Sequence, residues 1–254
     1  MSQIDFLGYS LAVNPFPIIL DKEKKIIINT INQNAFCVAE RDLLFKSALQ
    51  ASDILLPDGM SIVKACKYIT GKRLKKIAGA DMHNYLLKML NETKGKCFYL
   101  GASQETLNKI AIRMQNEYPL IETGYYSPPY KKSFDEKDIQ TMVKNINNFS
   151  PDIVFVGLTA PKQEKLVHLI KENIETRLIC SIGAVFDFYA GTITRPSEFW
   201  INLNLEWFIR FAKEPRRMWK RYLYYGAIFT YDIIVAKIKT INYLKKEIDK
   251  NSNI

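Results

Sequence analysis

The sequence predicts an α/β fold in which a parallel sheet is flanked by helices and followed by a helical appendage. Short apolar runs alternate with helical patterns up to Gly191, which is typical of strands joined by helices in a parallel sheet. The chain has 254 residues, of which 48% are hydrophobic and 24% charged, and this suits one globular domain with an appendage. After Gly191 the strand patterns stop. We therefore expect one domain over 1–195 and a helical appendage over 196–254.

The predicted elements follow from the period of the apolar residues. Strands are predicted at 25–30, 53–56, 97–100, 121–126, 153–156 and 178–182. Helices are predicted at 34–50, 61–69, 80–91, 135–146 and 161–173. A further helix follows Ser103, a favourable N-cap residue, because Leu107, Ile110, Ala111 and Met114 repeat at i, i+3, i+4 and i+7.

Charge and cysteine usage narrow the class of protein. The net charge of +10 predicts an anionic partner, which is a nucleic acid, an anionic lipid or a phosphorylated substrate. Four scattered cysteines without a C-x-x-C pair predict buried, reduced thiols in a cytoplasmic protein. The sequence shows no secretory signal and no apolar run of about 18 residues, so no membrane span is predicted.

The turn after the predicted strand 153–156 is the most informative stretch. Gly157 ends that strand, and Pro161 opens a helix that carries Lys162, Gln163 and Lys165 in its first turns. A helix N-terminus at a strand end presents free backbone N–H groups, and its dipole favours an anion. The pattern indicates either a phosphate-binding turn or an ordinary connection between a strand and a helix.

Other polar residues fall at predicted strand ends, where parallel sheets bind their ligands. Asp58 in Pro57-Asp58-Gly59 is either a turn residue or a general base. Thr30 and Asn32 are either helix caps or polar contacts to a substrate. Gly101 follows another strand. Asp187 stands alone in an apolar run, so it is either a structural hydrogen-bonding centre or a site residue.

Several common motifs are absent from the sequence. No Asp-x-Asp pair occurs, and His83 and His168 lack the spacing of metal ligands, so we expect no metal site and structural histidines. The pattern Gly-x-Gly-x-x-Gly is also absent, which disfavours an NAD-dependent oxidoreductase. No cofactor is predicted.

Four segments, which together span nearly the whole chain, carry a resemblance to a known family. They are Asn29-Thr30-Ile31-Asn32, Leu56-Pro57-Asp58-Gly59-Met60-Ser61-Ile62-Val63, Gly157-Leu158-Thr159-Ala160-Pro161-Lys162-Gln163-Glu164-Lys165, and Gly183 to Gly191 continuing through Arg195-Pro196, Leu205-Glu206-Trp207 and Glu214-Pro215-Arg216-Arg217. In this order they resemble the WecG/TagA/CpsF family of bacterial glycosyltransferases, glycosyltransferase family 26.

The resemblance implies a Rossmann-like, inverting hexosyltransferase whose catalytic domain is 1–195. Such an enzyme moves an N-acetylmannosamine-type or related hexose from UDP to an undecaprenyl-diphosphate-linked sugar in cell-surface polysaccharide or teichoic acid biosynthesis. Asp58 is then the catalytic base. The expected substrate-binding residues are Thr30, Asn32, Lys76, Gly101, Gly157, Pro161, Lys162, Gln163 and Asp187. Lys76 stands where the family usually has Arg, so it keeps the charge but lacks the bidentate fork.

Two further expectations concern the reaction and the partners. Because Asp-x-Asp is missing, helix N-termini and cationic side chains are expected to neutralise the leaving diphosphate without a metal. The sequence is also compatible with a homo-oligomer. The alternative from another class is a non-catalytic nucleotide- or nucleic-acid-binding module, which the net charge alone permits. Nucleic acid is disfavoured because the aromatic residues cluster with the C-terminal charges, away from the predicted sheet.

The C-terminal region suits an anionic membrane surface. Its cationic residues stand among Trp, Tyr and Phe, and the cations expected to contact the membrane or the substrate diphosphate are Arg210, Arg216, Arg217 and Arg221. Such segments lie in the membrane interface without spanning it. We therefore expect a cytoplasmic protein held peripherally on the inner face of the cytoplasmic membrane. The alternative is a basic, solvated helix whose aromatic residues pack on the core.

Overall fold

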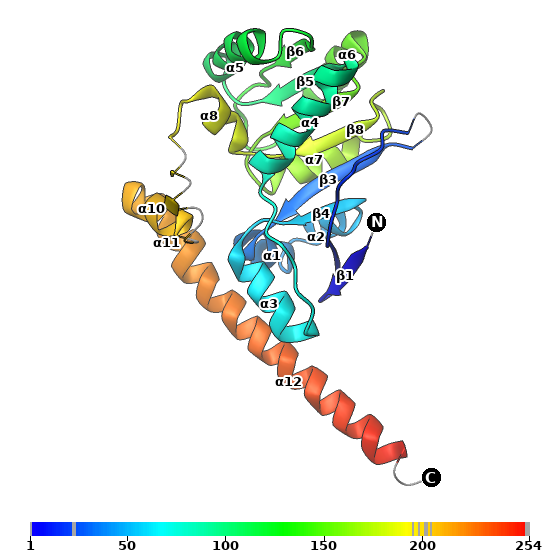
Figure 1. Ribbon diagram of the computed structural model, residues 1–254, viewed down its shortest axis with the longest axis vertical. Coiled ribbons are helices and arrows are strands. Elements are labelled where there is room, and N and C mark those ends of the chain that lie inside the picture. Colours follow the sequence, from blue (N-terminus) through cyan, green and yellow to red (C-terminus); the bar gives the residue numbers. More distant parts are fainter. Residues whose placement is uncertain are drawn as a thin grey trace.

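A computed structural model describes residues 2–21, 24–194, 196–197, 199–200, 203 and 205–251, without the side chains of Glu206, Arg217 and 243–251. It contains an eight-stranded sheet of order β1-β2-β4-β3-β8-β7-β5-β6, in which only the β1–β2 pair is antiparallel (Figure 1). The strands are β1 (Gln3–Phe6), β2 (Tyr9–Ala12), β3 (Ile26–Ile31), β4 (Ile54–Pro57), β5 (Lys96–Gly101), β6 (Glu122–Tyr126), β7 (Ile153–Gly157) and β8 (Leu178–Ser181). The predicted α/β class and mostly parallel sheet are confirmed.

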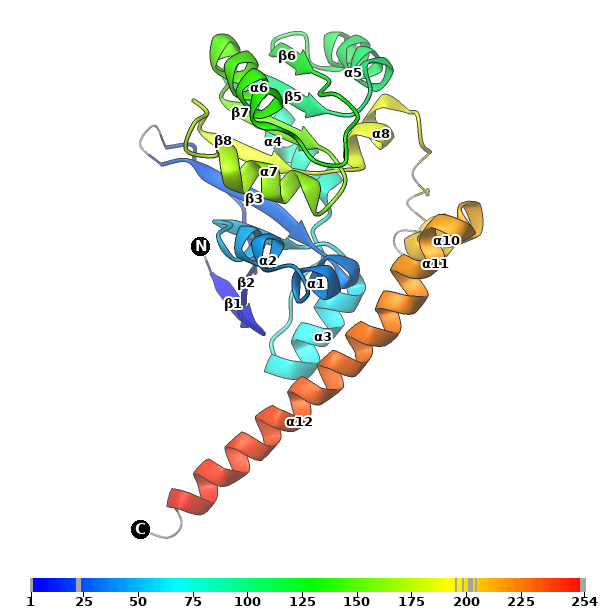
Figure 2. The same cartoon turned by 180° about the vertical axis from the view of Figure 1, so that it is seen from behind.

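Helices cover both faces of this sheet. They are α1 (Gln33–Ala39), α2 (Leu43–Gln50), α3 (Met60–Thr70), α4 (Gly79–Thr93), α5 (Gln104–Glu117), α6 (Glu136–Phe149), α7 (Lys162–Ile170) and α8 (Val185–Ala190). One core cluster packs α4, α5 and α8 on the sheet, and another packs α6 and α7 on the opposite face. Figure 2 shows α6 and α7 in front of the strands, whereas α4 lies in front in Figure 1.

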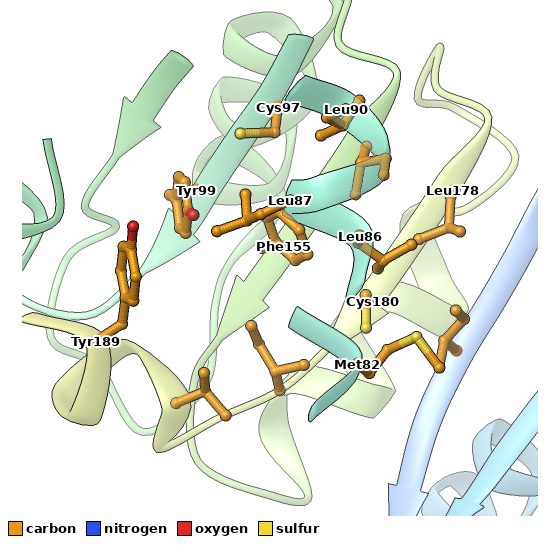
Figure 3. Packing of buried hydrophobic residues seen from close by; sticks show 14 of the residues in the cluster. Met82, Leu86, Leu87, Leu90, Cys97, Tyr99, Phe155, Leu178, Cys180 and Tyr189 are labelled. Carbon is orange, nitrogen blue, oxygen red and sulfur yellow. The ribbon is translucent and has the colours of Figure 1, made fainter. Parts of the chain in front are cut away.

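The first of these clusters explains why α4 lies where it does. Its apolar residues Met82, Leu86, Leu87 and Leu90 are at most 1% exposed and pack against β5, β7 and β8 (Figure 3). The helix begins where the Asp81 carboxylate accepts a hydrogen bond from the backbone N–H of Ala78 at 3.0 Å. Burial of each large apolar side chain contributes about 1.5–3 kcal/mol, so packing more than capping holds this helix in place.

The structure agrees with the predictions for the Ser103 cap and for the cysteines. Ser103 caps α5 by accepting a hydrogen bond from Thr106 N–H, as predicted. The four cysteines are free thiols and all are buried, which agrees with the expected reduced state. Burial raises the pKa of the Cys37 thiol to about 11, so this thiol stays protonated at neutral pH.

One sequence-based expectation on the elements was wrong, and two features of the structure were not predicted. The predicted helix 34–50 is two helices, because Asp42 accepts a hydrogen bond from Phe45 N–H and starts α2. The β1–β2 hairpin was not predicted, since its two strands have only four residues each. The apolar run at 183–188 contains the first residues of α8, which is too short to show a helical period.

The C-terminal region folds into α10 (Glu206–Lys213), α11 (Pro215–Trp219), a π-helical turn (Lys220–Tyr224) and α12 (Tyr225–Asn251). The first half of α12 packs on α1 and α3, where Phe229 meets Phe36 edge to face at 5.4 Å. The remainder of α12 runs on past α3, away from the sheet (Figures 1 and 2). Among the described helices, none combines the length and apolarity that a membrane crossing needs. Arg195, where the sequence places the domain boundary, lies outside the described residues.

Candidate functional site

A cavity of about 420 Å³ opens at the carboxyl ends of β3 and β4. Its wall is built from three parts of the chain, namely the ends of the two strands, the helices that follow them, and the C-terminal region. The lining residues are Asn32, Gln33, Asp58, Gly59, Met60, Ser61, Lys64, Lys76, Trp207, Arg210, Arg221, Tyr222 and Leu223. The cavity therefore joins Asp58, Asn32 and Lys76 to two of the predicted C-terminal arginines.

Strand register brings Asn32 and Asp58 together. Ile31 pairs with Pro57 in the parallel β3–β4 ladder, so the residues that follow them leave neighbouring strands at the same edge. The backbone N–H of Asp58 donates to the carbonyl of Ile31 at 2.9 Å. The Asn32 side chain accepts from Ala35 N–H at 3.1 Å and caps α1. Asp58 is half-buried, so its carboxylate lies in a defined place that a ligand can reach.

The cavity carries an excess of positive charge. Among the described residues that line it, Asp58 is the one acid, and four side chains are cationic, namely Lys64, Lys76, Arg210 and Arg221. Lys76 reaches this place because the backbone N–H of Ile77 donates to the carbonyl of Pro57 at 3.2 Å. This contact returns the 71–78 loop to the Asp58 turn. An arrangement of one carboxylate among several cations suits an anionic ligand with a nearby proton to remove.

The C-terminal region supplies one wall of the cavity. The amide of Gln33 donates to the backbone carbonyls of Arg221 and Tyr222 at 3.4 and 3.5 Å. Trp207 and Tyr222 meet edge to face, with ring centroids 5.9 Å apart. The guanidinium of Arg210 lies 5.4 Å from the centre of the Phe188 ring of α8. These contacts hold α10 and the π-helical turn over the Asp58 turn.

The turn after β7 does not contribute to this cavity. A Cβ atom on Gly157 would lie 2.3 Å from the Phe186 ring, and one on Gly101 would lie 2.5 Å from the Gly157 carbonyl oxygen. Gly101 also has a φ of 125°, which favours glycine. The two glycines thus allow close packing of strand ends. Gly157, Gly101 and Pro161, which the sequence predicts as substrate contacts, are absent from the cavity lining.

The side chains of Gln163 and Lys162 make contacts within the protein. Gln163 is 3% exposed; its amide oxygen accepts from Leu158 N–H at 3.3 Å, and its amide nitrogen donates to Glu164 at 2.9 Å. The Lys162 ammonium lies 3.7 Å from the centre of the Phe134 ring and donates to the carbonyl of Lys131. Burial raises the pKa of Glu164 to about 7, so this acid binds a proton close to neutral pH.

The remaining predicted residues lie elsewhere. Thr30 is inside β3, paired with Leu56. Asp187 lies in the first turn of α8 and accepts from the Thr192 hydroxyl at 3.3 Å. His83 is buried with its Nε2 at 2.8 Å from the Tyr99 hydroxyl, and burial lowers its pKa to about 3. A neutral, hydrogen-bonded His83 fits the structural role that the sequence favoured.

Another of the predicted C-terminal arginines, Arg216, is not among the described residues that line the cavity. Arg216 is exposed in α11, and the side chain of Arg217 lies outside the described part of the chain. Sequence reasoning also missed Gln33, Lys64, Trp207, Tyr222 and Leu223 as lining residues. The short spacing of Lys64 from Asp58 was an available signal, because α3 follows the Asp58 turn directly. Across the described ranges, no group of three or more His, Cys, Asp and Glu side chains is arranged to hold a metal ion.

Comparison with known proteins gives a consistent picture. The profile of the glycosyl transferase WecG/TagA/CpsF family matches residues 3–243. A protein of Bacillus subtilis (strain 168) is 31% identical over 92% of this chain and 90% of its own length. A protein of Staphylococcus aureus (strain MW2) is 25% identical over 94% of each chain. Both carry the name N-acetylglucosaminyldiphosphoundecaprenol N-acetyl-beta-D-mannosaminyltransferase.

Proposed function

Because the chain belongs to the glycosyl transferase WecG/TagA/CpsF family, we propose that it transfers an N-acetylmannosamine-type or related hexose from UDP to an undecaprenyl-diphosphate-linked N-acetylglucosamine. The names of the Bacillus and Staphylococcus relatives support this acceptor and this sugar. The observation that carries the proposal is the Asp58 carboxylate in a cavity whose described lining includes the cationic side chains Lys64, Lys76, Arg210 and Arg221. We further propose that the product enters cell-surface polysaccharide or teichoic acid synthesis.

Asp58 acts as the general base in this proposal. Its carboxylate takes the proton of the acceptor hydroxyl while the hydroxyl oxygen attacks the anomeric carbon. The bond from that carbon to the UDP oxygen breaks on the opposite face, so the anomeric configuration inverts. A positioned base contributes about 10²–10⁴-fold to the rate. Asn32 lies at the adjacent strand end and lines the same cavity. In this proposal its side-chain amide forms a hydrogen bond to one of the two sugars.

The cationic side chains neutralise the diphosphate groups. The departing UDP gains negative charge, and Lys76 with Arg210 lies in the same cavity as Asp58. Fixed cations at the site of developing charge lower the barrier electrostatically. We therefore propose a metal-independent reaction. Arg221 from the C-terminal region serves the acceptor diphosphate, since a guanidinium matches phosphate oxygens.

The C-terminal region also provides the membrane contact in this proposal. Trp219, Leu223 and Tyr224 are about half exposed in a stretch rich in Lys and Arg. Aromatic and cationic side chains together suit the headgroup layer of an anionic bilayer. Residues 1–195 form the catalytic domain and 196–254 the appendage, on the inner face of the cytoplasmic membrane, where UDP-sugars are available.

A transfer assay with purified full-length protein tests the proposal. UDP-N-acetylmannosamine and other UDP-sugars are offered with N-acetylglucosamine linked through diphosphate to a short, water-soluble prenyl chain. We expect a disaccharide product with inverted anomeric configuration by NMR, formed equally in excess EDTA. UDP binding without transfer to any acceptor would instead support a non-catalytic nucleotide-binding module. Loss of transfer in EDTA that Mg²⁺ restores would reject metal independence.

A further inference from the structure

Two aromatic rings from different helical elements meet in the wall of the cavity. Trp207 comes from the start of α10, and Tyr222 comes from the π-helical turn. Their ring centroids are 5.9 Å apart at an interplanar angle of 65°, which is a favourable edge-to-face geometry. Both rings line the cavity that contains Asp58. The protein therefore presents a preformed aromatic surface in the cavity that contains its proposed base.

Trp207 is not buried in the core of the protein. Its side chain is 45% exposed, although burial of a tryptophan is one of the largest apolar contributions that a side chain can make. Phe208 and Trp219 are similarly exposed in the same region, but neither lines the cavity. A half-exposed indole at a cavity wall leaves apolar ring surface for a ligand to cover.

Two guanidinium groups, those of Arg210 and Arg221, line the same cavity as the two rings. Arg210 follows Trp207 by three residues, so the two side chains lie on the same face of α10, and Arg221 directly precedes Tyr222. Leu223 also lines the cavity and is 56% exposed, so it faces both the cavity and the outside. Aromatic rings, guanidinium groups and an exposed aliphatic side chain thus occur together in this wall.

The proposed acceptor contains three chemical parts in a fixed covalent order, which are a sugar ring, a diphosphate and a prenyl chain. The apolar C–H face of a hexose ring covers an aromatic ring well because both surfaces lose contact with water. Guanidinium groups match the diphosphate, and Leu223 matches the first apolar carbons of the prenyl chain. We propose that Trp207 and Tyr222 form the subsite that binds the sugar ring of the lipid-linked acceptor, an inference that rests on the proposed function.

Kinetics with the short-chain, water-soluble acceptor test this subsite. Trp207→Leu and Tyr222→Leu should each raise the KM for the acceptor about tenfold or more, which corresponds to about 1.4 kcal/mol. The KM for the UDP-sugar should stay within about twofold, because the donor does not contact the rings. Trp200→Leu is the matched control, since this tryptophan is 37% exposed, does not line the cavity and has no role in the proposed function. It should leave both KM values unchanged.

A fluorescence titration tests binding of the acceptor to Trp207 without requiring turnover. The chain contains three tryptophans, Trp200, Trp207 and Trp219. Replacing the first and third by Phe leaves Trp207 as the single indole reporter in an otherwise complete chain. We expect its fluorescence to change on titration with the short-chain acceptor, and to stay constant with UDP alone.

The outcomes separate this inference from the proposed function. If the wild-type protein transfers sugar but the acceptor KM is unchanged in both ring variants, the subsite is wrong and the proposed function stands. A rise in the UDP-sugar KM, or a response of Trp207 to UDP alone, would show that the rings bind the uracil base and would overturn the inference. If the wild-type protein transfers no sugar, the proposed function fails, and the response of Trp207 to the acceptor still decides the subsite.

Discussion

Two turns at the same edge of the sheet have opposite characters. The turn after β4, at Asp58, opens on a cavity with cationic walls. In the turn after β7, the Phe186 ring fills the space beside Gly157, and the side chain of Gln163 is buried. Both have a strand, a glycine and a helix N-terminus in the same order. The strand–glycine–helix pattern therefore defines the path of the backbone, whereas side chains from distant segments decide whether space for a ligand remains.

The acids of the two turns differ in the same way. Asp58 is half-buried at the open cavity. Glu164 is 2% exposed, with one carboxyl oxygen bonded to Gln163 and the other without a partner in the described structure. Burial penalises the charged form, which raises the pKa of Glu164 to about 7. One acid therefore lines a cavity that is open to a ligand, and the other is buried at the start of α7.

The largest expected effect belongs to the open turn. Asp58→Asn should lower turnover by about 10²-fold or more, because an amide cannot accept the proton of the acceptor hydroxyl. Its melting temperature and its affinity for UDP should match those of the wild type, which calorimetry and titration measure. Near-normal turnover in the purified, folded variant would show that another group is the base.

A substitution in the turn after β7, the closed turn, should lower the free energy of unfolding. Gly157→Ala places a Cβ 2.3 Å from the Phe186 ring, and overpacking of this kind costs about 1–3 kcal/mol. Urea unfolding measures the loss. A second variant that adds Phe186→Leu should regain part of the stability, because the smaller side chain makes room. An unchanged unfolding midpoint in Gly157→Ala would mean that this turn is looser than its packing indicates.

The raised pKa of Glu164 makes the free energy of unfolding depend on pH. The folded-state pKa of Glu164, about 7, is above the ordinary value of 4.5 for a glutamate, so between these values the folded protein holds a proton that the unfolded chain has lost. The stability that Glu164 contributes is therefore full at low pH and decreases as the pH rises toward 7, by about 1.4 kcal/mol per pH unit.

Glu164→Gln removes this titration and isolates it from all other groups. The wild type should lose stability relative to the variant between about pH 5 and pH 7, and the difference should level off above that range. Urea unfolding of both proteins at matched pH values measures it. Parallel curves would contradict the raised pKa of Glu164.

The smallest effect is expected for Lys162, which the sequence predicts as a substrate contact. Its ammonium lies over the Phe134 ring, outside the cavity lining. Lys162→Ala should change the KM for the UDP-sugar by less than about twofold and the stability by about 0.5–1 kcal/mol, the size of an exposed cation–π contact. Lys76→Ala, the matched lysine of the open turn, should raise that KM about tenfold, or 1.4 kcal/mol. Equal effects would place the substrate across both turns.

Local sequence signals predicted much of the fold and part of the site. The Ser103 cap and the apolar strands are confirmed because they depend on neighbours within a few residues. The Pro57-Asp58-Gly59 turn was correctly placed at a strand end. The division of the predicted helix 34–50 was missed although its signal is local, because Asp42 accepts a hydrogen bond from Phe45 N–H and starts α2. The ion pair of Asp42 with Lys165 from α7 joins residues distant along the chain, so it leaves no trace in a local period.

The α/β class, the positions of most strands and the family of the protein follow from the sequence, because apolar period and motif order are properties of the chain alone. Tertiary packing sets which of the two turns opens on the described cavity. Phe186 fills the space beside Gly157, and the C-terminal region returns to set Trp207 and Arg221 beside Asp58. The physical reason is that a cavity exists where packed side chains leave space, and packing is the joint outcome of segments that are far apart in sequence.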